Sequence, residues 1–108
     1  MRTRQATRHP KRCVSPIIIR DSTQSKTRMQ LNKLFHEIVR YATLAPSSHN
    51  TQCWKFKVDS NSITVLPDFS RRCPVVDPDD HHLYVSLGCA VENIVIAAKA
   101  HGFSPEVD

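Results

Sequence analysis

Glycine and long apolar runs are both scarce in this sequence. Only 2 of its 108 residues are glycine, which excludes collagen-like repeats and flexible glycine-rich linkers. Its longest apolar stretch is interrupted by Glu92, Asn93 and Lys99, so it falls short of the roughly 20 apolar residues that cross a bilayer. A chain of about 100 to 200 residues makes one domain. We therefore expect a single folded domain that has no membrane partner.

Paired cysteines are also missing. Four cysteines are spread along the chain without a CxxC pair: Cys13, Cys53, Cys73 and Cys89. The apolar run Val14–Ile19 is too short for a secretory signal and contains Pro16, so we expect a reducing compartment and a cytoplasmic protein. A zinc site drawn from these cysteines and the histidines would lack ligands paired a few residues apart, which structural zinc sites normally have. We expect no metal site.

The positive charge is concentrated at one end of the chain. Residues 1–30 contain eight basic side chains and one acidic one, a net charge of +7, whereas residues 31–108 contain seven basic and nine acidic ones, a net charge of −2. Residues 1–28 show no sustained periodicity, although Ile17–Ile19 could form a short strand or only an apolar patch. We interpret residues 1–28 as a disordered, solvated basic arm. Such an arm could also bind phosphate backbones, lie on an anionic membrane or address the protein to an organelle.

Residues 29–45 have the spacing of an amphipathic helix. Apolar residues recur three and four positions apart: Leu31, Leu34, Phe35, Ile38, Ala42 and Ala45. This spacing places them on one helical face. Pro46 is expected to end the helix, because the residue before a proline avoids helical dihedral angles.

A polar loop at residues 47–52 and a predicted β-hairpin follow. Trp54, Phe56 and Val58 alternate along the first strand and share one of its sides. After a turn, a second strand at residues 63–66 should return antiparallel. Two strands alone are marginal in water, so the hairpin needs further strands or helices to pack on.

The second predicted helix spans residues 78–101 and is apolar on almost every side. Asp77 is expected to cap it, Pro78 suits its first position, and Gly102 suits the residue after its end. A helix without a polar face must be covered nearly all round, and one helix and a hairpin cannot supply that cover. We therefore expect self-association through this helix, and a further element that begins at Phe103.

The polar loop and the strand after it resemble a known motif. Residues 45–56 read APSSHNTQCWKF, which resembles the flavin-binding APSSxNxQPWxF segment of the nitroreductase family. Residues 86–94, SLGCAVENI, are similar to the family's central dimer helix, and the order of helix, hairpin and long helix also fits. The resemblance covers about residues 30–108, which correspond to the N-terminal part of the family's domain.

This resemblance implies an α+β fold in which an antiparallel sheet packs with helices, here truncated after the long central helix. Residues 29–108 would be the N-terminal portion of an FMN-binding domain that forms an obligate homodimer through the 78–101 helix. FMN would lie in a cleft between subunits, be reduced by NADH or NADPH, and be reoxidised by a small-molecule acceptor such as a nitroaromatic or a quinone. The chemistry would belong to the flavin, so no catalytic side chain is expected.

The cofactor-binding residues that the resemblance implies are Ser47, Ser48, Asn50 and Gln52. The first three match family positions that contact the flavin, often from the neighbouring subunit, and Gln52 would brace the same loop. Hydroxyls and amides provide the donors and acceptors that a flavin ring needs, although the same composition is also common in turns. The adjacent arginines at 71–72 could reach a phosphate or form a solvated pair in a loop.

The sequence departs from the family pattern in three ways. Cys53 replaces the proline of the QPW motif, which removes a fixed backbone angle. The Arg-x-Ser-x-Arg motif that commonly holds FMN is absent, since residues 20–28 only begin like it, and the family's C-terminal half is missing. We therefore expect an incomplete fragment, whose competence as an oxidoreductase depends on what it retains.

A second interpretation belongs to another functional class. The chain could be a small, basic-armed dimeric interaction or nucleic-acid-binding protein without catalysis. Phosphate binding by the arm would weaken steeply as the salt concentration rises. We expect no strong DNA binding, because the arm lacks interleaved aromatic residues and residues 31–108 carry a net negative charge.

Overall fold

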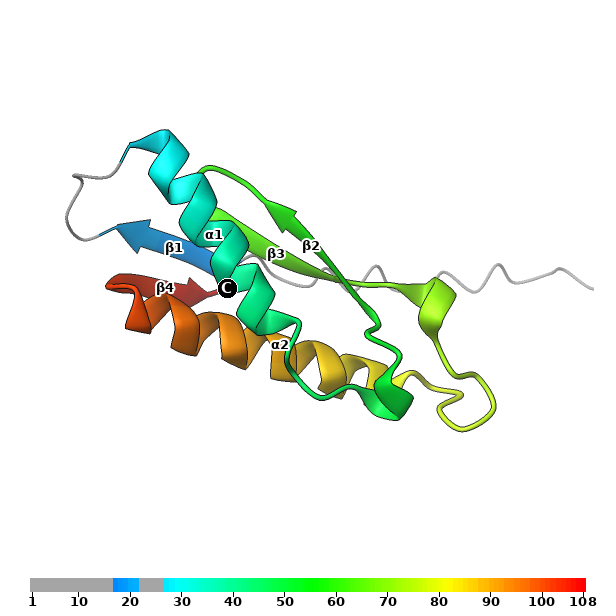
Figure 1. Ribbon diagram of the computed structural model, residues 1–108. Helices are drawn as coiled ribbons and strands as arrows, with labels where there is room; N and C mark the ends of the chain where they lie inside the picture. The colour runs from blue at the N-terminus through cyan, green and yellow to red at the C-terminus, as the bar shows by residue number, and fades with distance from the viewer. Residues whose placement is uncertain (1–16, 22–26) are drawn as a thin grey trace, which may run out of the picture.

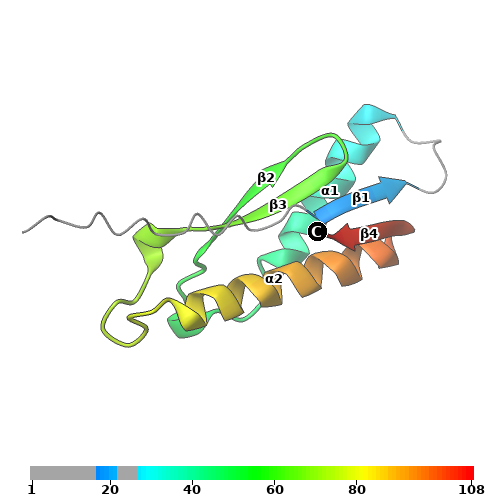
Figure 2. The same cartoon turned by 180° about the vertical axis from the view of Figure 1, so that it is seen from behind.

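The computed structural model describes residues 17–21 and 27–108. Along them follow β1 (Ile17–Asp21), α1 (Arg28–Ala42), the 3₁₀ turn η1 (Ser48–Asn50), β2 (Trp54–Val58), β3 (Ser62–Pro67), the 3₁₀ turn η2 (Phe69–Arg71), α2 (His81–Ala100) and β4 (Phe103–Val107). α1 crosses one face of the sheet, and α2 packs against α1, β3 and β4 (Figure 1 and Figure 2). The expected α+β class, an antiparallel sheet packed with helices, is confirmed.

β1 is an inner strand of the sheet. The strand order is β2-β3-β1-β4, and every neighbouring pair is antiparallel. Ile17 lies opposite Ile63 of β3 on one side and opposite Val107 of β4 on the other. Ile17 and Ile19 are buried, because alternate residues of a strand point to the same face.

The basic arm predicted for residues 1–28 is therefore too long. Residues 17–21 form β1 and belong to the folded domain, so the alternative of a short strand at Ile17–Ile19 is the correct one. The disorder predicted for residues 1–16 and 22–26 lies outside the described residues.

α1 begins one residue earlier and ends three residues earlier than predicted. At its start, Thr27 and Gln30 form a capping box, in which each side chain accepts a hydrogen bond from the other residue's backbone N–H (3.3 and 3.1 Å). Phe35, Ile38 and Ala42 bury the predicted apolar face. Beyond Thr43, the backbone N–H groups of Leu44 and Ala45 bond to carbonyls three residues back, which tightens and ends the last turn.

The predicted hairpin is confirmed. β2 and β3 pair from Trp54 opposite Pro67 to Val58 opposite Ile63. Trp54 is buried and Phe56 and Val58 are half-buried, whereas the lysines between them are exposed. The hairpin therefore places its apolar side against the helices, as the alternation predicted.

A further element begins at Phe103, as predicted. β4 pairs with β1 along its whole length. The Phe103 ring packs edge-on against Phe35 of α1, with the ring centroids 5.9 Å apart. This contact ties the end of the described chain to the core.

α2 begins at His81, three residues later than predicted, so the prediction of a helix start at Pro78 is wrong. The predicted capping role of Asp77 is confirmed, but it acts from outside the helix. Its two carboxylate oxygens accept hydrogen bonds from the backbone N–H groups of His82 and Leu83 (3.1 and 3.0 Å), which have no partner within the first helical turn. Asp80 occupies the position before the helix in a left-handed conformation (φ 59°).

Gly102 follows α2 as predicted. Its φ of 82° is left-handed, a conformation that costs glycine little because it has no Cβ. The chain can therefore turn sharply from α2 into β4.

A single copy of the chain covers one face of α2. Seven of its residues are buried: Leu83, Ser86, Leu87, Ala90, Ile94, Ala97 and Ala98. The opposite face is open, with Val85 52% and Ile96 57% exposed. With 20 residues and a mean hydropathy of 1.4, α2 is long and apolar enough to cross a membrane, contrary to our expectation, but the core helix of a soluble protein passes the same test. In this fold 39% of that apolar stretch is buried.

Candidate functional site

The four residues that the resemblance implicates lie together on the loop between α1 and β2 (Figure 1). Ser47 and Ser48 are half-buried, whereas Asn50 and Gln52 are exposed. The loop, residues 47–52, contacts α2. The structure thus brings all four residues into one segment beside the long helix.

Hydrogen bonds within the loop fix its backbone. The Ser47 hydroxyl oxygen accepts a hydrogen bond from the N–H of Gln52 (3.0 Å), and the Ser47 carbonyl accepts one from the N–H of Asn50 (3.0 Å). The Ser48 carbonyl accepts from the N–H (3.2 Å) and from the hydroxyl (3.0 Å) of Thr51. The hydrogen bonds of the loop backbone are therefore made largely within the loop itself.

Three residues of the loop have left-handed backbone conformations: His49 (φ 52°), Asn50 (φ 53°) and Gln52 (φ 50°). This region is uncommon for residues other than glycine, and asparagine tolerates it better than most. Such conformations persist only where the surroundings hold them. The contacts that hold this loop are therefore part of the candidate site.

Two contacts from outside anchor the loop. The backbone N–H of Ser48 donates a hydrogen bond to Oγ of Ser86 in α2 (3.1 Å), and that hydroxyl donates to the carbonyl of His82 (2.7 Å). On the other side, Nη1 of Arg71 donates to the carbonyl of Thr51 (3.2 Å). Sequence reasoning missed both anchors, because Ser86 stands alone in an apolar stretch and Arg71 was considered only as a solvated or phosphate-binding residue.

Two buried carboxylates support the segment after β3, and both have lowered pKa values. A hydrogen bond from the Ser70 hydroxyl lowers the pKa of Asp68 most; burial opposes this, and the Lys55 and Arg71 charges lower it further. Burial raises the pKa of Asp77, but hydrogen bonds from the start of α2 outweigh that effect. Both groups are therefore ionised at neutral pH.

Arg72 is engaged in the same region. Its Nε lies 3.0 Å from Oδ1 of Asp80, and its Nη2 donates to the carbonyl of Pro78 (3.3 Å). Arg71 also faces Asp68 (3.7 Å). The two arginines thus hold loop residues in place, so neither is simply solvated, as one of our alternatives proposed.

The space between the loop and α2 is nearly filled. A cavity of about 10 Å³ there is lined by Ser48, Thr51, Cys53, Arg71, Arg72, Cys73, Asp77 and Leu83. That volume is no more than one water molecule requires. A ring system could therefore contact only the outer side of the loop, where the exposed side chains lie.

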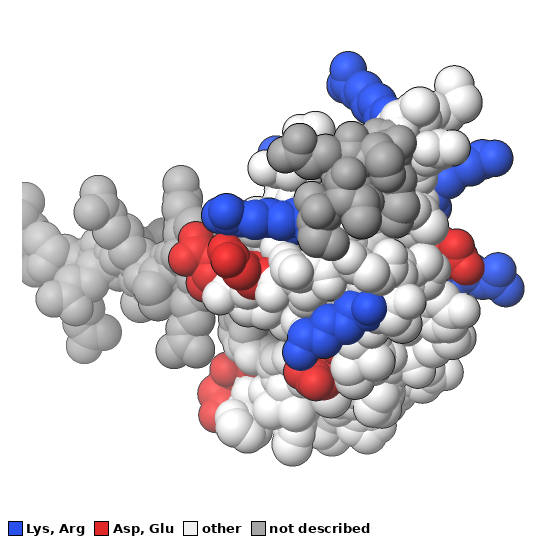
Figure 3. All heavy atoms as spheres, turned by 90° about the vertical axis from the view of Figure 1, so that its left-hand side faces the viewer, with Lys and Arg blue, Asp and Glu red and all other residues white. Residues whose placement is uncertain are grey.

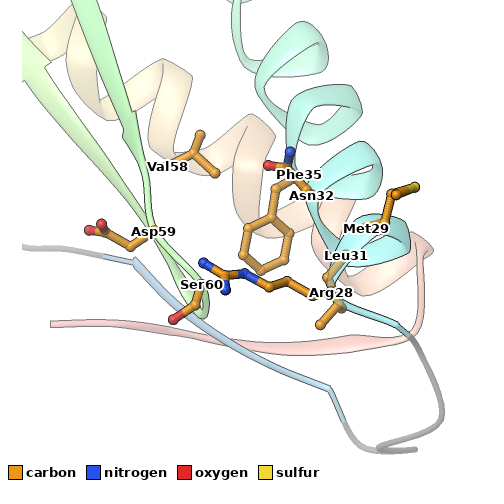
Figure 4. A pocket seen from close by; sticks show the side chains of 8 residues that line it. All are labelled: Arg28, Met29, Leu31, Asn32, Phe35, Val58, Asp59 and Ser60. Carbon is orange, nitrogen blue, oxygen red and sulfur yellow. The ribbon is translucent and has the colours of Figure 1, made fainter.

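A larger groove lies at the other end of α1. It has a volume of about 610 Å³ and lies between the first turns of α1 and the β2–β3 turn (Figure 4). The Arg28 side chain extends across it toward Ser60, beside the ring of Phe35. None of the residues implicated by the sequence lines this groove.

The side chains that project outward from the loop are available to hydrogen-bond a ligand. Within residues 17–21 and 27–108, the side chains of Ser48, Asn50 and Gln52 have no hydrogen-bond partner. A hydroxyl and two amides supply donors and acceptors side by side. This set suits a planar ligand that carries carbonyl oxygens and N–H groups, as the flavin ring does.

Comparison with known proteins also indicates the nitroreductase family. Residues 18–79 match the family described as "Putative TM nitroreductase". Over 73 residues the chain is 34% identical to proteins named "Putative NAD(P)H nitroreductase" from two Mycobacterium tuberculosis strains, CDC 1551 / Oshkosh and ATCC 25618 / H37Rv. The match covers 66% of this chain and 21% of each relative, so the chain spans about a fifth of the length of these relatives. No solved structure matches significantly.

Proposed function

Since this chain belongs to the nitroreductase family, we propose that it takes part in the FMN-dependent reduction of nitroaromatics, quinones or similar acceptors, with NADH or NADPH as electron donor. One observation carries the proposal. The uncommitted side chains of Ser48, Asn50 and Gln52 project from a loop whose backbone is already fixed. The names of the relatives, which specify an NAD(P)H nitroreductase, support the choice of electron donor.

The role of the loop is to bind and orient the cofactor. Asn50 and Gln52 offer amide donors and acceptors to the ring, and Ser47 can still donate its hydroxyl hydrogen although its oxygen accepts from Gln52. FMN, when bound, supplies the redox chemistry by accepting a hydride from NAD(P)H and passing electrons to the acceptor. The chain's own residues then need no acid, base or nucleophile, and their task is to hold the ring and exclude water from one of its sides.

We also propose that a second copy of the chain completes the site. The cavity behind the loop is too small to enclose a ring, at about 10 Å³. Meanwhile Val85 and Ile96 are exposed on α2, and Ile96 lines an apolar groove of about 380 Å³ to which Tyr41 and Leu44, near the end of α1, also contribute. Exposed apolar patches of this kind favour association, and a homodimer through α2 would bury them.

Sedimentation velocity at micromolar concentration tests the dimer. We expect a dimer that dissociates in Ile96→Glu but persists in Val107→Glu, whose site is similarly exposed (55%) on β4. A monodisperse monomer for the unmodified chain, or equal dissociation in both variants, would contradict the proposed interface.

A reducing, cytoplasmic location is a further proposal. Cys53, Cys73 and Cys89 are free thiols in the described part of the chain, which is the usual state in a reducing compartment. Cell fractionation followed by thiol alkylation before lysis tests this proposal, and we expect alkylated thiols in the cytosolic fraction. Recovery of the protein as a disulfide from an oxidising compartment would contradict it.

The visible absorption spectrum of the protein, purified from cells supplied with riboflavin, tests cofactor binding. We expect FMN released in near-stoichiometric amount, and NAD(P)H oxidation when a nitroaromatic is added. Asn50→Asp keeps a residue that tolerates the left-handed backbone but removes the amide donor, so it should lower the FMN content. Asn61→Asp, the same change in the exposed β2–β3 turn, should leave it unchanged. A colourless protein that remains folded would contradict the proposal.

A further inference from the structure

Ser86 is an exception within α2. The helix around it is apolar, and yet this serine is only 4% exposed. Within the described residues, only Asp68 and Asp77 share with it the combination of a polar side chain and burial. A buried polar side chain costs free energy unless hydrogen bonds satisfy it, so its partners explain why it is there.

The Ser86 hydroxyl both donates and accepts a hydrogen bond. Its hydrogen is donated to the carbonyl of His82, one turn earlier (2.7 Å), and its oxygen accepts the N–H of Ser48 (3.1 Å). The first bond does not explain the choice of serine, because such a bond to the i−4 carbonyl slightly destabilises a helix and alanine is the better helix former. The second bond does explain the serine, because it links α2 to the loop, 38 positions away in the sequence.

The hydrogen bond between Ser48 and Ser86 lies next to the left-handed residues of the loop. Ser48 is the first residue of η1 and immediately precedes the left-handed residues His49 and Asn50. The other hydrogen bonds of the loop are internal, and the Arg71 contact on the far side comes from a side chain that is 56% exposed. The hydroxyl of Ser86, a buried residue, is therefore the contact that fixes how the loop is oriented on α2.

We infer that Ser86 is a positioning residue, which holds the Ser47–Gln52 loop in the orientation that presents Asn50 and Gln52 to the flavin. This inference rests on the proposed function for its ligand. Its structural part, the fixing of the loop by Ser86, stands on the hydrogen bonds alone. Ser86 is buried and its hydroxyl is bonded to the loop backbone and to His82, so its loss should change the affinity for FMN and the mobility of the loop but not the fold.

Amide hydrogen exchange on the protein without added FMN tests the structural part. In Ser86→Ala we expect the N–H of Ser48 to exchange about five- to tenfold faster, since one hydrogen bond of this kind contributes a factor of that order. The N–H groups of His82 and Leu83, which Asp77 holds, should exchange as before. Ser86→Thr keeps the hydroxyl and should restore the slow exchange. Ser104→Ala, the same change at an exposed position of β4, is the matched control.

Fluorescence titration with FMN tests the functional part. We expect the dissociation constant to rise about tenfold in Ser86→Ala, to recover in Ser86→Thr and to stay unchanged in Ser104→Ala, with similar melting temperatures throughout. If the unmodified protein binds no FMN, the proposed function fails, and the exchange of Ser48 still decides whether Ser86 fixes the loop. Unchanged Ser48 exchange in Ser86→Ala overturns the inference. Loss of the fold in that variant also overturns it, because Ser86 would then act on global stability.

Discussion

The two ends of α2 are held by different kinds of contact. The loop end, which comprises residues 47–52, residues 68–80 and the first turns of α2, is tied together by side-chain hydrogen bonds to backbone groups. The sheet end, which comprises β1, β4, the start of α1 and the last turns of α2, is held by apolar packing of Ile17, Ile19, Phe35 and Phe103. Figure 3 looks onto the sheet end, where charged side chains of both signs are scattered over a mostly uncharged surface.

The two kinds of contact suit two tasks, stability at the sheet end and function at the loop end. Apolar burial is proportional to area and tolerates small shifts of geometry, so the apolar packing of the sheet end can supply stability without specifying any one atom. Hydrogen bonds depend on direction and distance, so the loop end fixes particular side chains in particular places. The candidate site lies at the end where geometry is specified atom by atom.

The largest expected effect comes from the apolar core of the sheet end. Ile94 of α2 is fully buried (0% exposed), and Ile94→Ala should lower the free energy of unfolding by about 2 to 5 kcal/mol, because it removes buried methyl groups and leaves a cavity. Urea unfolding monitored by circular dichroism measures this change.

The matched control for this variant lies on the same helix. Ile96 is 57% exposed, and Ile96→Ala should change the free energy of unfolding by no more than about 0.5 kcal/mol, at protein concentrations low enough to keep the chain monomeric. Equal losses in the two variants would show that the open face of α2 is also covered, and would remove the contrast between its two faces.

The apolar pattern made much of the fold predictable. The helical spacing in α1 and the alternation in β2 are local signals, and the structure confirms both elements. β1 was foreseen only as one of two alternatives for Ile17–Ile19, because a five-residue strand within a basic segment has no internal periodicity and its partners lie about 45 to 90 residues away. The start of α2 was misplaced because Asp77 caps it across a turn, a contact that sequence spacing does not encode.

The sequence predicted where the candidate site lies, but not which contacts hold it in position. A recognisable motif located Ser47, Ser48, Asn50 and Gln52. The anchors from Ser86 and Arg71 depend on tertiary contacts across 38 and 20 positions, and no local pattern marks either residue.

A medium effect is expected from the cap of α2 at the loop end. Asp77→Ala removes both acceptors of the His82 and Leu83 N–H groups, and should lower the melting temperature by about 5 °C, as the loss of a helix cap does in a domain of this size. Asp79→Ala is the control, since Asp79 is exposed and its contact with the N–H of His81 is long (3.4 Å). If the control destabilised the protein as much, the position of the cap at Asp77 would be contradicted.

Acid should weaken the loop end in particular. The pKa values of Asp68 and Asp77 are lowered from the ordinary value of 3.8, so these groups bind protons more weakly in the folded than in the unfolded chain. Their stabilising contribution is present above pH 3.8 and is lost as the pH falls through their lower folded-state pKa values. Urea midpoints measured from neutral to acid pH should therefore fall, and the fall should be smaller in the double variant D68N/D77N. An unchanged pH dependence in that variant would contradict the lowered pKa values.

The smallest expected effects come from one ion pair at each end of α2, and the two losses of unfolding free energy can be compared directly. Arg20 and Glu106 at the sheet end lie 3.5 Å apart with their side chains 68% and 62% exposed, whereas Arg72 and Asp80 at the loop end lie 3.0 Å apart with 36% and 16% exposed. Water screens an exposed pair almost completely, so Glu106→Gln should change the free energy of unfolding by less than about 0.5 kcal/mol. Asp80→Asn, which keeps a residue that tolerates the left-handed backbone, should cost about 0.5 to 1 kcal/mol, because the negative charge that strengthens this shorter and less hydrated hydrogen bond is lost. Urea unfolding at low and high salt distinguishes the two, and equal costs would mean that polar contacts contribute alike at both ends of α2.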